Sequence, residues 1–272
     1  SWTAPADNGG NTISSYVVGY RAGTSGAYTN ITGVASSPRV ITGLTNGTSY
    51  QFIVSAVNAA GTGTASAAIS STPITVPAAP TGLAASVVAG TTTSATGTIN
   101  LSWNAVAATD AAPVSGYRIY RMDGATPTLL SATASTSYSA TGLTNGTSYS
   151  FQVAAYGTGG EGTKTSSVSA TPYRIPNAPT GVTVTNAGTG DANSLRMNIG
   201  FTAPANNGGS AVIDYTASCT SSDGGTARSG TGASSPILIT GFTRDKNYTC
   251  TVTARNLAGS SPASCASSSF LP

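Results

Sequence analysis

The chain has 272 residues, of which only 7% are charged against about 25% in an ordinary soluble domain, and its formal net charge is +3. It contains no histidine, which excludes Ser-His-Asp relays and imidazole metal sites, and a single glutamate, Glu161, which excludes a pair of catalytic glutamates. The few basic residues are scattered and no apolar run reaches the ~18 residues of a membrane helix, so we expect no enzyme activity, cofactor, metal, nucleic-acid partner or membrane insertion.

The chain is built from a repeat of about 99 residues. The segment 41–50, ITGLTNGTSY, recurs as ATGLTNGTSY at 140–149 and more loosely as ITGFTRDKNY at 239–248. A period of this length is a whole domain rather than a solenoid unit of 20–50 residues. Proline-rich stretches at 73–80 and 172–179 mark the joints, and proline makes such joints extended and stiff. The expected repeats are 1–74, 75–173 and 174–272.

Short strands are expected throughout each repeat. Alternation of apolar with polar side chains is the dominant local signal, and no helical period of useful length occurs. Valine, threonine and tyrosine, which suit a pleated surface, fill these segments, and Gly, Asn, Ser and Pro separate them. About seven such strands in a repeat of this length predict an all-β antiparallel sandwich. In chain order, the clearest strands are 16–20, 50–56, 117–120, 149–155, 215–219 and 248–254.

The order of features in the second repeat resembles that of fibronectin type III domains. A Pro-Ala-Ala-Pro start is followed by Trp103, by Tyr117 and then by the segment LTNGTSY that ends at Tyr149. The resemblance covers the whole chain and implies three tandem fibronectin type III-like, immunoglobulin-like antiparallel β-sandwiches. The chain looks most like the Thr-, Ser-, Gly- and Ala-rich versions of secreted bacterial proteins, which implies an extracellular or cell-surface location.

The resemblance also implies structural roles for particular side chains. In the family, a tyrosine hydroxyl hydrogen-bonds to the backbone upstream and locks the crossing between the two sheets. The third repeat departs from the pattern, because Phe201 replaces the tryptophan and residues 244–246 replace the Asn-Gly turn. The expected tyrosine corners are Tyr50, Tyr149 and Tyr248, and the expected core residues are Trp2, Trp103, Phe201, Leu44, Leu143 and Phe242.

The first repeat is shorter than the second at its start. About 25 residues of expected strand precede Trp103 within its repeat, whereas one residue precedes Trp2. The first sandwich therefore lacks strand A and part of strand B, which leaves a sheet edge unpaired. We expect the sequence to be an ordered window of a longer multi-repeat protein. The alternative is that a neighbouring chain donates the missing strand in trans.

All three cysteines lie in the third repeat. Cys219 ends one predicted strand, and Cys250 follows Tyr248 by two residues on the core-facing side of another strand that is expected to pair with it. We therefore predict a Cys219–Cys250 disulfide, which points to an oxidising compartment. Two buried thiols are the alternative. Cys265 is left over and is expected to be a buried thiol rather than half of an intermolecular bond.

Two glycine-rich loops have nearly the same sequence. Residues 5–10 are PADNGG and residues 204–209 are PANNGG, and both lie between predicted strands. Asp, Asn and Gly are typical of tight turns, since Asn and Gly tolerate a positive φ. A calcium loop is the alternative, but these segments supply too few carboxylates for six to eight oxygen ligands. We interpret both as turns.

These features favour a non-enzymatic extracellular rod that spaces, displays or assembles something at a cell, filament or virion surface. Its partners would be other domains of the same longer chain or neighbouring copies in a surface assembly. A second hypothesis is an adhesive module that binds glycan or protein, for which exposed aromatic rings are suited. A third is the accessory repeat region of a secreted polysaccharide-degrading enzyme. The tyrosines outside core-type positions, and hence the candidate binding residues, are Tyr20, Tyr28, Tyr156 and Tyr173.

Overall fold

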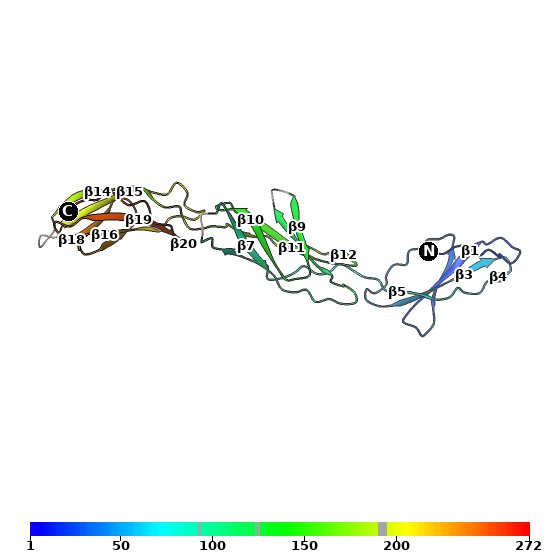
Figure 1. Ribbon diagram of the computed structural model, residues 1–272. Coiled ribbons are helices and arrows are strands. Elements are labelled where there is room, and N and C mark those ends of the chain that lie inside the picture. The colour runs from blue at the N-terminus through cyan, green and yellow to red at the C-terminus, as the bar shows by residue number, and fades with distance from the viewer. Residues whose placement is uncertain (92–93, 123, 125, 190–194) are drawn as a thin grey trace.

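The computed structural model describes residues 1–91, 94–122, 124, 126–189 and 195–272. Within these ranges the chain forms strands and turns but no helix, and hence none long and apolar enough to cross a membrane. Every pairing between the strands of these ranges is antiparallel. The all-β class is confirmed, and Figure 1 shows three groups of strands that follow one another.

The second repeat is a sandwich of two sheets. One sheet has the order β10-β7-β6, and the other has the order β12-β11-β8-β9 with β13 also paired to β11. Alternating side chains from both sheets bury a core that includes Ile99, Ile119 and Phe151. The strands are β6 (Ala84–Val88), β7 (Thr96–Ser102), β8 (Gly116–Met122), β9 (Pro127–Thr133), β10 (Ser137–Thr144), β11 (Tyr149–Gly157), β12 (Gly160–Glu161) and β13 (Val168–Ala170).

The third repeat repeats this architecture. Its sheets have the orders β14-β15-β18 and β17-β16-β19-β20. The core between them includes Ile199, Tyr248 and Val252, all of which are almost completely buried. The strands are β14 (Thr180–Thr189), β15 (Leu195–Thr202), β16 (Asp214–Ser221), β17 (Arg228–Gly232), β18 (Ile237–Phe242), β19 (Tyr248–Asn256) and β20 (Gly259–Ser260).

The first repeat has one sheet. Its order is β2-β1-β3-β4, and β5 also pairs with β3. Residues 1–14 and 35–49 contain no strand, so no second sheet covers the apolar face of this one. The strands are β1 (Ser15–Ala22), β2 (Thr29–Val34), β3 (Tyr50–Asn58), β4 (Gly61–Thr62) and β5 (Ile69–Ser71).

An aromatic pair occupies corresponding positions in all three repeats. In each repeat, the tyrosine at the second position of β1, β8 or β16 contacts an aromatic ring that precedes that strand in the chain. Such tilted or edge-on contacts add about 0.5–1.5 kcal/mol to the burial of the rings. The pairs, with the distances between ring centroids, are Trp2–Tyr16 (5.2 Å), Trp103–Tyr117 (5.5 Å) and Phe201–Tyr215 (4.7 Å).

The expected core residues differ in how deeply they are buried. Those that are buried are Trp103, Leu143 and Phe242. Trp2 and Leu44 are only half-buried, because the sheet that would cover them is absent from the first repeat. Phe201 is also half-buried and packs at the edge of the third core. Trp2 and Phe201 nevertheless pack against the buried clusters of their repeats, so these residues lie at the margin of a core and not at its centre.

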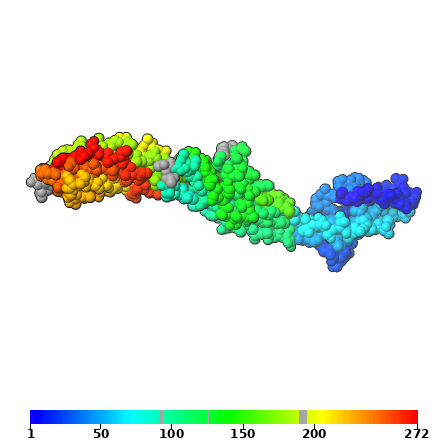
Figure 2. Space-filling model, viewed as in Figure 1, coloured from blue at the N-terminus to red at the C-terminus, as the bar shows by residue number. Residues whose placement is uncertain are grey.

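The three repeats lie end to end, and the space-filling view shows a slender body (Figure 2). Backbone hydrogen bonds hold the linkers. In the first joint, the Thr75 amide donates to the Ala111 carbonyl at 2.6 Å; in the second, the Arg174 amide donates to the Gly208 carbonyl at 2.8 Å. The repeat boundaries after residues 74 and 173 stay predictions.

Candidate functional site

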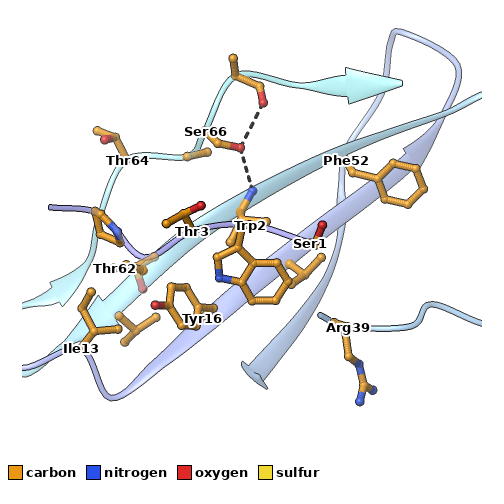
Figure 3. Close-up of a pocket in the computed structure, with 18 of the residues that line it drawn as sticks. Ser1, Trp2, Thr3, Ile13, Tyr16, Arg39, Phe52, Thr62, Thr64 and Ser66 are labelled. Carbon is orange, nitrogen blue, oxygen red and sulfur yellow. Dashed lines mark hydrogen bonds between the residues drawn. The ribbon is translucent and has the colours of Figure 1, made fainter. Parts of the chain in front are cut away.

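A cavity of about 1010 Å³ lies over the uncovered face of the first sheet. Tyr16, Val18 and Val54 from β1 and β3 line it, and the N-terminal segment adds Trp2 and Ile13 (Figure 3). The lining therefore combines apolar side chains with polar ones, and its charged residues are Asp7 and Arg39. Such a surface is suited to covering by another apolar element, such as a strand.

The indole of Trp2 lies beside the Tyr16 ring in this cavity (Figure 3). The Trp2 amide donates to Ser37 Oγ at 2.8 Å, which ties the N-terminal segment to the loop after β2. The Trp2 Nε1 atom is buried without a hydrogen-bond partner, but so is Nε1 of Trp103 in the second repeat. The unpartnered indole is thus a property of this sequence position and does not mark a ligand site.

The tyrosine corners have the same geometry in each repeat. The hydroxyl of each tyrosine accepts a hydrogen bond from the backbone amide five residues upstream. The distances are 3.0 Å from Thr45 to Tyr50, 3.0 Å from Thr144 to Tyr149 and 3.2 Å from Thr243 to Tyr248. The Tyr248 hydroxyl also donates to the Thr226 carbonyl at 2.9 Å, so it is doubly bonded in a buried position.

The four candidate binding tyrosines do not form one platform. All are half-buried, and they are distributed over the first repeat, the second repeat and the second joint. The guanidinium of Arg21 lies 4.4 Å from the centre of the Tyr28 ring, and that of Arg118 lies 4.9 Å from the Tyr156 ring. A cation therefore covers one face of each of these two rings, which leaves less aromatic surface for a sugar.

A charged cluster that the sequence analysis missed surrounds Glu161. Its carboxylate accepts hydrogen bonds from Tyr120 Oη at 2.6 Å, from Arg118 at 2.8 Å and from Lys164 at 3.0 Å. Burial alone would raise the pKa of Glu161, but these three donors outweigh it and lower the pKa to about 2. The pKa of Arg118 is raised mainly by its hydrogen bond to the same carboxylate. The cluster is a partly exposed ion network in which both carboxylate oxygens are engaged.

The third repeat contains a disulfide between Cys219 and Cys250, which are directly opposite each other on β16 and β19. The remaining cysteine, Cys265, is exposed. The expectation of a buried Cys265 thiol is therefore wrong. The reason is local: Ser264 and Ser267 turn their side chains into the repeat and accept hydrogen bonds from the β19 backbone, so that Cys265, next to Ser264, faces solvent.

Comparison with known proteins identifies the fold. The family described as Fibronectin type III domain matches residues 1–72 and 78–171, which is more than half of the chain. The chain belongs to this family. The fibronectin type III family, expected from the tyrosine and tryptophan pattern, is thereby shown. No group of three or more His, Cys, Asp or Glu side chains suited to a metal ion occurs among the described residues.

Two curated relatives contain similar sequence. Exoglucanase B of Cellulomonas fimi is 34% identical over 211 residues, which are 74% of this chain and 17% of that protein. Chitinase A1 of Niallia circulans is 36% identical over 160 residues, which are 57% of this chain and 20% of that protein. This chain thus spans a fifth or less of the length of each of these relatives. Among solved structures, the FN1–FN3 domains of chicken CNTN1 align with 95% of this chain and 89% of theirs, with 17% identity and a TM-score of 0.42.

Proposed function

We propose that this chain is a non-catalytic extracellular spacer, in which tandem fibronectin type III repeats hold parts of a larger assembly apart. The observation that carries the proposal is the attachment of both linkers. In each joint a linker amide is bonded to a loop of the following repeat, and the carbonyls of Pro73 and Pro172 accept bonds from Gly47 and Gly146 of the preceding repeat. A linker held from both sides transmits orientation from one repeat to the next.

Three further features agree with an extracellular spacer. The disulfide of the third repeat persists in oxidising compartments. The low charge makes the surface insensitive to salt, because few charges are available to be screened. Repeats that contact only their sequence neighbours can also be added in series without changing each core.

We further propose that the assembly is a polysaccharide-degrading enzyme. The supporting observation is that both relatives are named for such an activity, an exoglucanase and a chitinase, while the shared sequence is a fifth or less of each. The spacer would then separate the catalytic part of the protein from its other parts. Adhesion through tyrosine faces has weaker support, since cations cover the Tyr28 and Tyr156 rings.

Incubation of the chain with suspended cellulose and chitin distinguishes a spacer from an adhesive module. A spacer stays in the supernatant and releases no soluble sugar. Retention on either polysaccharide that disappears in a Tyr20→Ala/Tyr173→Ala variant would contradict the spacer and support adhesion. A Leu129→Ala variant, altered at an exposed apolar residue of the second repeat, is the matched control for non-specific adsorption.

A further inference from the structure

The joint between the second and third repeats rests on two loops at one end of the third repeat. One is the turn 206–209 after β15, and the other is the hairpin turn 256–259 between β19 and β20. We call these two loops the dock of repeat 3. Asn256 lies at its centre, is 2% exposed, and donates from Nδ2 to the carbonyls of Arg174 (2.7 Å) and Asn207 (2.8 Å). One side chain thus joins the linker to the turn.

The backbone of the turn completes the contact with the linker. The Arg174 amide donates to the Gly208 carbonyl at 2.8 Å, and the Asn177 amide donates to the Asn206 carbonyl at 3.0 Å. Gly208 is buried, and a side chain there would collide with the Arg174 carbonyl oxygen. The glycine is therefore needed for the close approach of the linker.

The first repeat carries the same two loops at the same end, residues 7–10 and 58–61, and we call them the dock of repeat 1. Asn58 donates from Nδ2 to the Asn8 carbonyl at 2.8 Å, the distance found for its counterpart in the dock of repeat 3. Gly9 has a φ of +66° against +79° in its counterpart, and each amide bonds a side-chain oxygen two residues upstream at 2.8 Å. The dock of repeat 1 has the geometry of the occupied one.

Nothing in the described part of the chain occupies the dock of repeat 1. The second Nδ2 hydrogen of Asn58, which in the third repeat bonds the linker carbonyl, has no acceptor there. No atom lies within 4 Å of a side chain built on Gly10 or Gly61, whereas Gly209 and Gly259 face the second repeat and the linker. Because the loops keep their geometry without an occupant, the surface is preformed.

We propose that the dock of repeat 1 binds the C-terminal end of a fibronectin type III repeat of the kind of repeat 2. The bound parts are the Asn-Gly turn of that repeat and the extended, proline-flanked linker that follows it. In this complex, a carbonyl of the bound linker accepts a hydrogen bond from Asn58 Nδ2, as the Arg174 carbonyl accepts one from Asn256 in the second joint. An amide of the bound linker donates to the Gly9 carbonyl, as the Arg174 amide donates to the Gly208 carbonyl. The proposal goes beyond the spacer role, since it concerns a recognition surface and not what the rod carries.

The sequence of the third repeat argues against a second copy of this chain as the occupant. In the second joint, the backbones of Gly146 and Gly209 touch, so that neither position has room for a side chain. The residue at the position of Gly146 in the third repeat is Asp245, with a φ of +57°. The third repeat of another copy would therefore place the charged side chain of Asp245 against Gly10. A repeat with the Asn-Gly turn has no such conflict.

The first test uses the chain as it exists. Asn206→Asp converts the turn of the third repeat, Asn-Asn-Gly-Gly, into that of the first, Asp-Asn-Gly-Gly. Hydrogen exchange of the Arg174 and Asn177 amides reports whether the second joint stays closed. We expect exchange within about threefold of wild type for Asn206→Asp and at least tenfold faster exchange for the control Asn256→Ala. Equal acceleration by both variants would overturn the proposal, because the repeat 1 sequence would then be unable to dock.

The second test supplies the occupant. Residues 75–200 are placed directly before Trp2, so that a second copy of repeat 2, its linker and its following strands precede the first repeat. A Tyr173→Phe mark gives the added linker a separate mass in exchange measurements, and the native linker serves as the internal standard. We expect the added linker to be protected like the native one, and Asn58→Ala to remove protection from the added linker alone.

Two outcomes of this second test would overturn the proposal. One is an added linker that exchanges freely while the native linker is protected. The other is a dimer of the unmodified chain, seen by light scattering, that Asn58→Ala dissociates, since the dock would then take a second copy. If the extended chain fails to fold, the Asn206→Asp variant still decides whether the repeat 1 turn is able to dock.

Discussion

At the scale of single residues, Glu161 organises the most charged cluster described in the second repeat. Its carboxylate holds Tyr120 from β8 together with two cations, and its side chain is 20% exposed. Because Tyr120 and Arg118 lie on β8 and Glu161 on the two-residue strand β12, the cluster connects the short edge strand to the centre of the sheet. We therefore expect Glu161 to stabilise the edge of the sheet.

The low pKa of Glu161 predicts how this stabilisation depends on pH. The pKa is about 2 in the folded chain and about 4.5 without its partners, so the stabilisation is present above pH ~4.5 and is lost as the pH falls towards 2. We expect Glu161→Gln to lower the free energy of unfolding by about 1–2 kcal/mol at pH 7, since its partly exposed partners are screened by solvent. Denaturant titration of the Trp103 fluorescence in a Trp2→Phe background measures this. A deficit as large at pH 2.5 as at pH 7 would contradict the assignment.

The corner tyrosine of the third repeat gives a second prediction. Tyr248→Phe leaves the Thr243 amide and the Thr226 carbonyl without their buried partner, so we expect the repeat to lose about 1–3 kcal/mol of stability. Calorimetry measures the change in the unfolding transition of this repeat, which is recognised by its shift when the disulfide is reduced. Tyr173→Phe, which alters a half-buried tyrosine in the joint, is expected to change stability by less than about 0.5 kcal/mol. Equal effects of the two substitutions would show that the corner bond has no special role.

At the scale of elements, the disulfide crosslinks the two central strands of one sheet. Cys219 on β16 and Cys250 on β19 have a sequence separation of 31, and for a loop of this length the chain-entropy model gives about 3–4 kcal/mol. We expect Cys219→Ala/Cys250→Ala to lower the free energy of unfolding of the third repeat by about 3–4 kcal/mol. The free energy of unfolding of the second repeat should stay unchanged, because each repeat has its own core. The control is Cys265→Ala, which removes an exposed thiol. A parallel shift of both transitions would mean that the repeats unfold as one unit.

Features of the fold could be predicted from the sequence where they depend on neighbouring residues or occur in every repeat. The strands β3, β11 and β19 follow from period-two alternation after a turn that occurs three times. The burial of Trp2 could not be predicted, because it depends on a covering sheet and not on the residue itself. Cys265 is exposed, contrary to the expectation of a buried thiol, because two serines occupy the inward positions on either side of it.

The contacts between segments far apart in the chain could not be predicted from the sequence either. Glu161 has no counterpart in the other repeats, and its partner Arg118 lies 43 residues away. Asn256 and Arg174 are 82 residues apart, so their bond across the joint left no local signal. The match between residues 5–10 and 204–209 is visible in the sequence and predicts two turns. The proposed docking role of these turns follows only from the structure, in which the linker lies against the turn of the third repeat.

At the scale of the whole molecule, the three repeats form a stiff rod in the role proposed above. A repeat of this fold is roughly 30 Å long, since its strands rise ~3.3 Å per residue, so three in series give about 90–100 Å. Such a rod has a radius of gyration of about 28–30 Å, whereas a compact chain of this length has about 18–19 Å. The difference is large enough for a solution measurement to decide.

Small-angle X-ray scattering of the unmodified chain is that measurement. We expect a radius of gyration of about 28–30 Å. We also expect the distance distribution to broaden in Asn256→Ala, because that variant releases the second joint. A radius near 18–19 Å, or a wild-type distribution already as broad as that of Asn256→Ala, would contradict the stiff spacer.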